Sequence, residues 1–583
     1  MVVLRPLRFA PIAAVLFASA CVPPPGAPVP APPPPHATTE GVPENSPGLV
    51  SAADPRAADA GAQMLRLGGS ATDAAIATML ALTVVEPQSS GIGGGGFLVT
   101  GDAAGRVETI DGRETAPKAA GPQWFYAAGK PLSYGDAIPG GRSVGVPGNL
   151  RLAALAHNRH GKLSWRTLFQ PAIRLAREGF AITPRMRASL AGASRTGAYD
   201  PAARALFYGS DGQPLPAGTV VRNPALAATL ESIAARGADS FYSGDNATTI
   251  AAKVGTAPTN PAPMTTADIA AYKAVERPAI CGDYRGYRIC GMGPPSSGAT
   301  TVLAILKQLE RFDMKALGPA NATSWHLIAE AQRLAYADRD QYLADSDFVS
   351  VPVTGLVDPA YLAGRSALIS ADATMPTALP GTPPGAKIAF APALAQEEHG
   401  TTHFVAVDRW GNAASYTSTV EGPFGSGLMV GGYYLNNQLT DFNIVPDKDG
   451  KPTANRVEGG KRPRSSMSPT LVYGPDGRLR LAIGAAGGST IPAQVSKAII
   501  GVLDWGLSAR DAIAAPTIFA PGGDVVFVEQ GTMLEAMIPQ LQKLGHGKVI
   551  ARSPSFKANA IERIGGMWRG AADPRSEGAS VAP

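Results

Sequence analysis

Cysteine and histidine, the side chains that most often bind metals, are scarce in this chain. Its 583 residues include only three cysteines and seven histidines, which leaves little material for a metal site. We therefore expect neither a bound metal nor a cofactor.

Clusters of basic residues are also missing. The 51 Lys and Arg residues exceed the 46 Asp and Glu residues by only five, and no run of them reaches the size of a nucleic-acid patch. A Gly-x-Ser-x-Gly motif after a strand is absent as well. These absences exclude nucleic-acid partners and a serine hydrolase of the nucleophile-elbow type.

The first twenty residues are predicted to be a signal peptide, 1–20. Arg5 and Arg8 precede a short apolar run at 9–17, and Ala18-Ser19-Ala20 forms a small-residue cleavage site. The apolar run is too short to span a membrane as a mature helix.

Cys21 follows the predicted signal directly. It is either the lipidated first residue of an exported lipoprotein, attached to a membrane, or an ordinary residue after a secretion signal. Both alternatives place the protein outside the cytoplasm, in the periplasm. The proline-rich stretch 21–48 is expected to form an extended tether without a core.

Cys281 and Cys290 flank a predicted strand–turn–strand, "GDYRGYRI". In a hairpin the two can face each other, and export permits a disulfide between them. Two free buried thiols are the alternative.

Two motifs suggest chemistry that their surroundings do not support. "GIGGGG" contains a formal dinucleotide fingerprint, but a helical segment precedes it and a strand follows, the reverse of the required order. "HGTTH" spaces His399 and His403 like a zinc protease but lacks the glutamate. We expect a glycine loop and a strand at these places.

The order of elements predicts a layered α/β fold with an antiparallel core. Apolar spacing predicts helices in the first part of the chain, including 149–160, 165–178 and 223–236. Strand-like segments dominate from Thr401 onward: "THFVAVD", "AASYTST", "GGYYLNN", "TLVYG" and "RLRLAIG".

The segment that begins at Thr401 is predicted to be a hairpin. Residues 402–407 and 413–419 alternate like half-buried strands around the turn "DRWGN". A five-residue loop places Thr401 opposite Thr419, and a loop one residue shorter places it opposite Ser418. Either register puts a second hydroxyl beside Thr401.

Cleavage of the Gly400–Thr401 bond would give Thr401 a base of its own. The new α-amine would have a pKa of about 7.7–8.0 and would lie on the same residue as the hydroxyl, an arrangement that activates threonine as a nucleophile. Gly400 favours such cleavage because its backbone can twist toward the attacking hydroxyl. A plain structural hairpin is the alternative.

"GTTHF" with "DRWGNAASYTST" resembles the self-processing site of γ-glutamyltransferases, which are N-terminal-nucleophile hydrolases. The resemblance continues in the family's order through "SSGIGGGGF", "IDGRETAP", "GDYRGYRI", "GPPSSGAT", "AYADRDQYLADSDFV", "LNNQLTDF", "KRPRSSMSPT", "GAAGGS" and "ADPRSEG". It implies a four-layer αββα sandwich and a precursor that cuts itself into a large subunit, 49–400, and a small subunit, 401–583.

The resemblance also implies the roles of individual residues. Thr401 would be the nucleophile and Thr419 its partner, with an oxyanion hole formed by the Gly487 and Gly488 amides. The remaining implied residues bind the two charged groups of a glutamyl substrate: Arg113, Ser465 and Ser466 the α-carboxylate, and Gln438, Asp441 and Glu421 the α-ammonium.

The sequence departs from the family pattern at two positions that shape the site. Glu421 stands where several members have asparagine, and Arg464 replaces a common leucine beside the serine pair. An extra carboxylate at 421 is compatible with an ammonium group, and Arg464 would add attraction for a carboxylate or alter the pocket.

The implied activity is transfer of the γ-glutamyl group of glutathione or a related compound to water, an amino acid or a peptide. A glutaryl or cephalosporin acylase with the same machinery is the alternative, against which Glu421 and Asp441 argue because its substrate lacks the α-amine. A non-catalytic lipoprotein that binds glutamyl peptides is a second alternative.

Overall fold

The computed structural model describes residues 41–387, 390–392, 400–554 and 556–583. The predicted signal peptide 1–20, Cys21 and residues 22–40 of the proline-rich stretch lie outside these residues. The tether predicted for 21–48 is wrong at its end, since β1 (Val42–Pro43) pairs with β24 (Met567–Ala572). This pairing of backbone groups makes residues 42–43 part of the fold.

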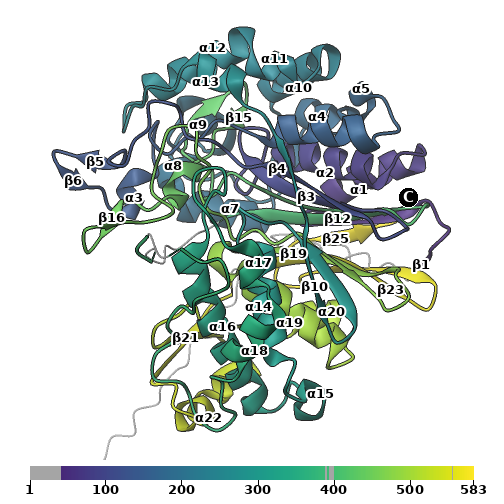
Figure 1. Ribbon diagram of the computed structural model, residues 1–583. Helices are drawn as coiled ribbons and strands as arrows, with labels where there is room; N and C mark the ends of the chain where they lie inside the picture. Colours follow the sequence, from purple (N-terminus) through teal and green to yellow (C-terminus); the bar gives the residue numbers. More distant parts are fainter. Residues whose placement is uncertain (1–40, 388–389, 393–399, 555) are drawn as a thin grey trace, which may run out of the picture. The chain divides into compact units, whose positions relative to one another are not determined.

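Two antiparallel sheets of seven strands form the centre of the structure (Figure 1). Sheet I has the order β25 (Ala579–Val581), β2 (Gly48–Ala52), β12 (Thr402–Asp408), β13 (Ala413–Thr419), β3 (Gly95–Gly101), β4 (Val107–Gly112) and β9 (Val275–Arg277). Sheet II has the order β1, β24, β23 (Lys557–Ile564), β19 (Leu479–Ala486), β18 (Thr470–Tyr473), β11 (Tyr287–Gly291) and β10 (Ile280–Tyr284).

Helices cover the outer face of each sheet, and the two sheets pack on each other (Figure 1). Sheet I is covered by α1 (Pro55–Arg66), α2 (Ala71–Val85) and α4 (Asn149–His160), and sheet II by α14 (Gly298–Leu309), α19 (Ile491–Leu503) and α20 (Ala509–Ala514). Every residue of α2 is buried, as expected for a helix that is apolar on all sides. The four-layer arrangement predicted from the resemblance is confirmed.

The predicted hairpin forms β12 and β13 in the centre of sheet I. Thr402 pairs with Ser418 and Val407 with Ala413, which is the register expected for the longer loop. The strands are not half-buried, however, because every residue in both is buried. Val405 and Val407 pack in the apolar cluster shared with sheet II, and Phe404 and Ala406 pack on the helices.

Several other predicted elements differ in extent. Helix α4 has the predicted bounds, whereas the helix expected at 165–178 is divided into α5 (Trp165–Leu168) and α6 (Gln170–Glu178). Pro171 at the start of α6 has no N–H to continue the hydrogen-bond ladder. The "GGYYLNN" segment is a strand only at β15 (Tyr433–Tyr434).

Residues 91–94 of the glycine-rich segment lie in the loop between α2 and β3, and its last two glycines begin β3, so it lacks the context of a dinucleotide site. Its glycines permit close approach of backbones: a Cβ at Gly93 would lie 2.0 Å from the Tyr434 carbonyl oxygen, and one at Gly94 would lie 1.9 Å from that of Thr419. This loop therefore packs directly behind the end of the hairpin.

Strands β10 and β11 form the predicted hairpin around "GDYRGYRI". Cys281 and Cys290 are paired across it and joined by a disulfide bond. The alternative of two free thiols does not apply to this structure.

Candidate active site

Thr401 and Thr419 meet at the open end of the β12–β13 hairpin. The Thr401 hydroxyl donates a hydrogen bond to the Thr419 Oγ1 at 3.1 Å, and the Glu421 amide donates to the same oxygen at 2.7 Å. Thr401 is 5% exposed and Thr419 is 1% exposed. Because paired residues share one face of a sheet, both hydroxyls lie on the face turned toward sheet II.

The backbone at the predicted cleavage point has an unusual conformation. Gly400 has φ +92° and Thr401 has φ +104°, a region that a β-branched residue rarely adopts. A Cβ at position 400 would lie 1.9 Å from the Glu421 carbonyl oxygen, so only glycine fits there. Strain of about 1–3 kcal/mol is typical of such a residue, and here it is located at the Gly400–Thr401 bond.

The residues implied to bind the two charges of a glutamyl group contact each other. The Arg113 guanidinium is ion-paired with Asp441, and it also donates to the carbonyls of Pro463 at 3.1 Å and Arg464 at 2.8 Å. The Gln438 side-chain amide donates to the same Asp441 oxygen at 2.6 Å. Arg113 is 1% exposed, so it is a buried cation whose position is fixed from three sides.

The serine pair follows on the other side of Arg113. Ser465 lines the cavity next to Thr401, and its hydroxyl accepts a hydrogen bond from the Met467 amide at 3.1 Å. The Ser466 hydroxyl instead accepts one from Arg339 of α16 (Ala322–Tyr342) at 2.5 Å. The two serines therefore have different environments.

Arg464 contacts the site through its backbone and helix α16 through its side chain. Its side chain is ion-paired with Asp340 of α16 at 3.2 Å, and it is not among the described residues that line the cavity. Its contribution to the site is its backbone, since its carbonyl accepts from Arg113.

Glu421 lies beside the threonine pair and is held by two neutral donors. The Tyr134 hydroxyl donates to one carboxylate oxygen at 2.8 Å, and the Asn437 side-chain amide donates to the other. The Asn437 oxygen accepts from the Gly422 amide at 2.8 Å. Glu421 also has a positive φ of +76°, so its backbone turns sharply just after β13.

Gly487 and Gly488 follow strand β19 of sheet II and face Thr401. Their φ angles are +127° and +55°, and two such angles in succession favour glycine. Gly487 lines the same cavity as Gly400, and Gly488 lines the cavity that contains Arg113 and Asp441. The glycine pair thus contributes to the lining of both cavities, and Thr401 lines both of them as well.

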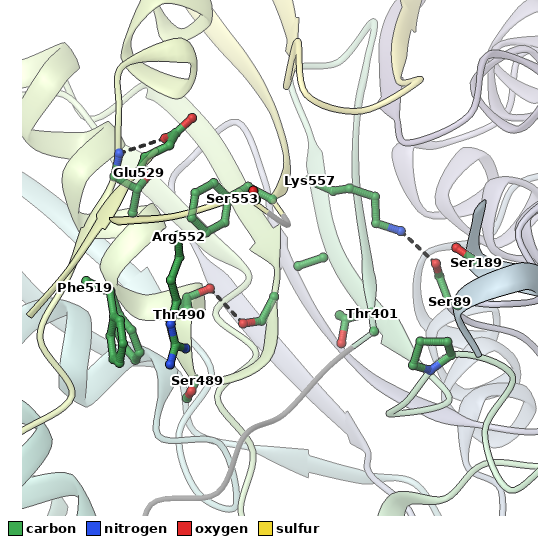
Figure 2. Close-up of a pocket in the computed structure, with 18 of the residues that line it drawn as sticks. Ser89, Ser189, Thr401, Ser489, Thr490, Phe519, Glu529, Arg552, Ser553 and Lys557 are labelled. Atoms are coloured by element: carbon green, nitrogen blue, oxygen red, sulfur yellow. Dashed lines mark hydrogen bonds between the residues drawn. The ribbon is translucent and has the colours of Figure 1, made fainter. Parts of the chain in front are cut away.

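These two cavities differ in size and lining. The cavity between Thr401 and the Arg113–Asp441 pair has a volume of about 10 Å³, room for about one water molecule. The cleft on the opposite side of Thr401 has a volume of about 810 Å³ (Figure 2). The chain is continuous through Gly400–Thr401, and the charged residues Arg113, Glu421 and Asp441 line the smaller cavity.

Glu114 adds a buried carboxyl group behind Arg113. It is fully buried, and neither of its oxygens has a hydrogen-bond partner among the described residues. Burial raises the pKa of Glu114 to about 8, although the Arg113 charge favours the ionised form. The group is therefore neutral through most of the physiological range.

His403 is a core residue of β12. It is fully buried, its Nδ1 lies 2.8 Å from the Thr417 hydroxyl, and burial lowers its pKa to about 3. His399 lies outside the described residues. The strand expected in place of a zinc motif is present.

Three residues of the site were not singled out from the sequence: Tyr134, Asn437 and Arg339. Asn437 lies inside the "LNNQLTDF" motif, so its neighbours Gln438 and Asp441 give a signal for it. Tyr134 and Arg339 come from distant parts of the chain, and only the tertiary fold brings them to Glu421 and Ser466.

Known proteins resemble this chain over nearly its whole length. The family model for gamma-glutamyltranspeptidase matches residues 57–582. The glutathione hydrolase proenzyme of Bacillus subtilis (strain 168) is 35% identical over 550 residues, covering 92% of this chain and 91% of that protein.

Acylases are similar to the same degree. The Acylase ACY 1 proenzyme of Pseudomonas sp. (strain SE83) is 36% identical over 573 residues, covering 95% of this chain and 97% of that protein. The crystal structure of cephalosporin acylase from Bacillus halodurans has a TM-score of 0.82 at 27% identity, covering 96% of this chain and 99% of that one. The choice of substrate therefore rests on the residues of the site.

Proposed function

The chain belongs to the γ-glutamyltranspeptidase family, and on that premise we propose that it is a self-processing γ-glutamyltransferase and glutathione hydrolase. The observation that carries the proposal is the Thr401–Thr419 hydroxyl pair, which lies next to the buried Arg113–Asp441 pair. A nucleophile and a binding site for a zwitterionic amino-acid group thus adjoin each other.

Maturation is the first reaction in this proposal. The Thr401 oxygen attacks the Gly400 carbonyl carbon, the C–N bond of Gly400–Thr401 breaks, and the proton lost from the Thr401 hydroxyl passes to the leaving nitrogen, which becomes the free α-amine. Water then hydrolyses the resulting ester and frees the carboxyl group of Gly400. The positive φ angles of Gly400 and Thr401 support this step, because cleavage relieves backbone strain.

The cut leaves a large subunit, 49–400, and a small subunit, 401–583, that begins with Thr401. Its α-amine has a pKa of about 7.7–8.0 when unperturbed, so it acts as the base for its own hydroxyl. The hydrogen bond between Thr401 and Thr419 orients that hydroxyl.

Catalysis repeats the same attack on a substrate. The Thr401 oxygen adds to the γ-carbonyl of the donor, and the amides of Gly487 and Gly488 donate to the developing oxyanion, a large term in acyl transfer. The leaving amine departs with a proton from the Thr401 α-amine. Water or an acceptor amine then takes the γ-glutamyl group from the enzyme.

The α-carboxylate and α-ammonium of the donor bind in the small cavity. Arg113, Ser465 and Ser466 are assigned to the carboxylate, because a guanidinium can form two parallel hydrogen bonds to it. Gln438, Asp441 and Glu421 are assigned to the ammonium. Since Arg113 and Asp441 are paired with each other in the uncut chain, the donor replaces that pairing with its own two charges.

The acylase alternative requires a substrate without the ammonium group. A glutaryl chain offers no ammonium group to match the buried carboxylates of Glu421 and Asp441, whereas a γ-glutamyl group does. The two carboxylates therefore favour the γ-glutamyl substrate over the glutaryl one.

Export to the periplasm is part of the proposal. The signal-like residues 1–20 and Cys21 support it, with Cys21 as a candidate lipid anchor. No helix within the described residues is both long and apolar enough to cross a membrane.

Intact mass and anilide hydrolysis test the proposal together. We expect the purified protein to show two chains, the smaller beginning at Thr401, and a Thr401→Ala variant to remain one chain. The mature protein should hydrolyse a γ-glutamyl anilide and not a glutaryl anilide. A single full-length chain in the wild type would contradict the proposal. A preference for the glutaryl anilide would favour the acylase alternative. Binding of γ-glutamyl compounds without turnover would favour the non-catalytic alternative.

A further inference from the structure

Two neutral polar residues from the turn after α2, Gln88 and Ser89, line the large cleft. The Gln88 backbone carbonyl accepts a hydrogen bond from the Phe424 amide at 3.3 Å. The Ser89 carbonyl accepts one from the Val420 amide at 3.3 Å. Because Val420 directly follows Thr419, these bonds hold the turn beside the end of the β12–β13 hairpin.

Gln88 presents a buried amide oxygen without a partner. The residue is 4% exposed, and its Oε1 atom has no hydrogen-bond partner among the described residues. A buried acceptor that lacks a donor is costly, and such groups are rare in folded proteins. Since Gln88 lines the cleft, a ligand bound there can supply the missing N–H group.

Ser89 presents a hydroxyl that can donate. Its oxygen accepts a hydrogen bond from the Lys557 amine at 2.8 Å, and Lys557 also donates to the two carboxylate oxygens of Glu86 at 3.0 and 3.2 Å. These bonds use all three N–H groups of a lysine ammonium, which itself accepts no hydrogen bond. Lys557 is the only partner of the Ser89 hydroxyl among the described residues, and Figure 2 shows this bond at the cleft. The hydrogen of the Ser89 hydroxyl is therefore left for a ligand.

The cation behind Ser89 is balanced by an anion. Lys557 and Glu86 are both buried and form an ion pair at 3.0 Å. Burial lowers the pKa of Lys557 to about 8, whereas the Glu86 charge acts against that shift, so the ammonium form prevails at neutral pH. This part of the wall consequently offers the cleft one acceptor and one donor without a net charge. A peptide group, with one N–H and one C=O, is the complement of that arrangement.

The cleft also lies on the required side of the nucleophile. Thr401 and Gly487 line it, whereas Arg113, Gln438 and Asp441 line the small cavity on the other side of Thr401. If the small cavity binds the acyl group of the donor, the cleft receives the group on the amine side of the bond that is broken. In a two-step transfer, the leaving group and the acceptor occupy this same space.

We propose that Gln88 and Ser89 bind the first peptide group beyond the scissile bond, so that the enzyme selects γ-glutamyl peptides over γ-glutamyl derivatives of simple amines. The Gln88 Oε1 atom accepts a hydrogen bond from the peptide N–H, and the Ser89 hydroxyl donates one to the peptide carbonyl. The inference rests on the proposed function, because it names the class of amine-side group for the same reaction.

Two donors that differ only by N–H against O test the role of Gln88: γ-glutamylalanine N-methylamide and γ-glutamylalanine methyl ester. We expect Gln88→Met to lower kcat/KM for the N-methylamide about fivefold, equivalent to about 1 kcal/mol for one hydrogen bond. The ester should stay within about twofold, since it has no N–H to lose. Glutamate release per cleaved enzyme measures both rates, and the ratio between variants removes the difference in leaving-group reactivity.

Ser89→Ala provides a second measurement, which also decides the matter if Gln88→Met does not mature. We expect this variant to lower kcat/KM for the N-methylamide about fivefold and to change γ-glutamyl-4-nitroanilide less than twofold, because the anilide has no carbonyl at the corresponding position. Ser89→Thr keeps the hydroxyl and should retain the wild-type ratio.

Gln213→Met is the matched control, because Gln213 is exposed and is not among the described residues that line the cleft. Equal loss on both alanine donors with Gln88→Met, or loss on neither, would overturn the inference, as would equal effects of Ser89→Ala on the N-methylamide and the anilide. In those cases turnover by the wild type would leave the proposed function intact. A wild-type enzyme that releases glutamate from none of these donors would overturn the proposed function and the inference with it.

Discussion

At the scale of single residues, Thr401 and Thr419 carry hydroxyls with different partners. Thr401 donates to Thr419, and Thr419 also accepts from the Glu421 amide. Thr419 thereby links Thr401 to the turn that carries Glu421. In the proposed reaction, the Thr419 hydroxyl orients the Thr401 hydroxyl, which attacks the carbonyl.

Replacing Thr419 by valine separates these two roles. Thr419→Val keeps the shape but removes the acceptor, and we expect self-cleavage to slow roughly tenfold to a hundredfold, since one or two buried hydrogen bonds of about 1–3 kcal/mol are lost. Thr419→Ser keeps the hydroxyl and should cleave at nearly the wild-type rate. The cleaved fraction after cell-free synthesis, followed on denaturing gels, measures both, and equal rates for the valine and serine variants would contradict the prediction.

Glu114 makes a residue-scale contribution to the pH dependence of stability. Its pKa rises from 4.5 to about 8 on folding. The stability associated with the neutral carboxyl is fully present below pH 4.5 and is lost as the pH rises to about 8, because the unfolded state ionises first. The slope is about 1.4 kcal/mol per pH unit for one such group.

We therefore expect Glu114→Gln to flatten the decline in the free energy of unfolding between pH 4.5 and 8. Denaturant midpoints at several pH values measure the slope, which is informative even if the buried amide lowers stability overall. Glu178→Gln, at an exposed position in α6, should retain the wild-type slope. An unchanged slope in Glu114→Gln would show that this carboxyl is ionised in the folded protein.

At the scale of elements, the hairpin depends on the glycine loop behind it. Gly94 accepts hydrogen bonds from the amides of Gly148 and Asn149 at the start of α4, and it touches the Thr419 carbonyl on its other side. The loop thus joins β3, α4 and the end of β13. Close packing of backbones accounts for the glycines of this loop, and a nucleotide-binding role is not needed to explain them.

Gly94→Ala tests that packing. The added Cβ would lie 1.9 Å from the Thr419 oxygen, so the strand end has to move, at a cost of about 1–3 kcal/mol. We expect a lower melting temperature and little self-cleavage. Gly121→Ala is the control because a Cβ there meets nothing within 4 Å, and wild-type behaviour of Gly94→Ala would contradict the prediction.

At the scale of the whole described fold, the two predicted subunits are interleaved. In sheet I, β12 and β13 of the small subunit lie between β2 and β3 of the large subunit, and in sheet II, β18 pairs with β11 of the large subunit. Both sheets therefore contain strands from before and after Thr401. A cut at this point breaks one covalent bond and no strand pairing.

We accordingly expect the two chains to remain together after cleavage. They should co-elute from a size-exclusion column under native conditions and separate only in denaturant, because their separation would break backbone pairing in both sheets. The uncut Thr401→Ala variant gives the reference elution volume. Folded subunits that separate without denaturant would contradict this expectation.

Local pattern determined the hairpin and many helices in this protein. The spacing of "THFVAVD" and "AASYTST" around "DRWGN" limited the partner of Thr401 to Thr419 or Ser418, because hairpin register follows from turn length, and the structure has the register of the longer loop. Helix α4 was likewise bounded by its own apolar spacing and the glycine after it. The resemblance to a family supplied Arg113, Asp441 and the glycine pair, which spacing does not connect.

Only the tertiary structure decided what surrounds these residues. Sheet II buries one face of the hairpin and the helices bury the other. Tyr134 and Asn437 hold Glu421, Asp340 pairs with the Arg464 side chain, and Arg552 stacks on Phe527 in the large cleft. Each of these contacts links residues far apart in the chain or depends on how strands are paired. A period along the sequence reports which residues share a face of one element, but only the packing of elements determines what that face meets.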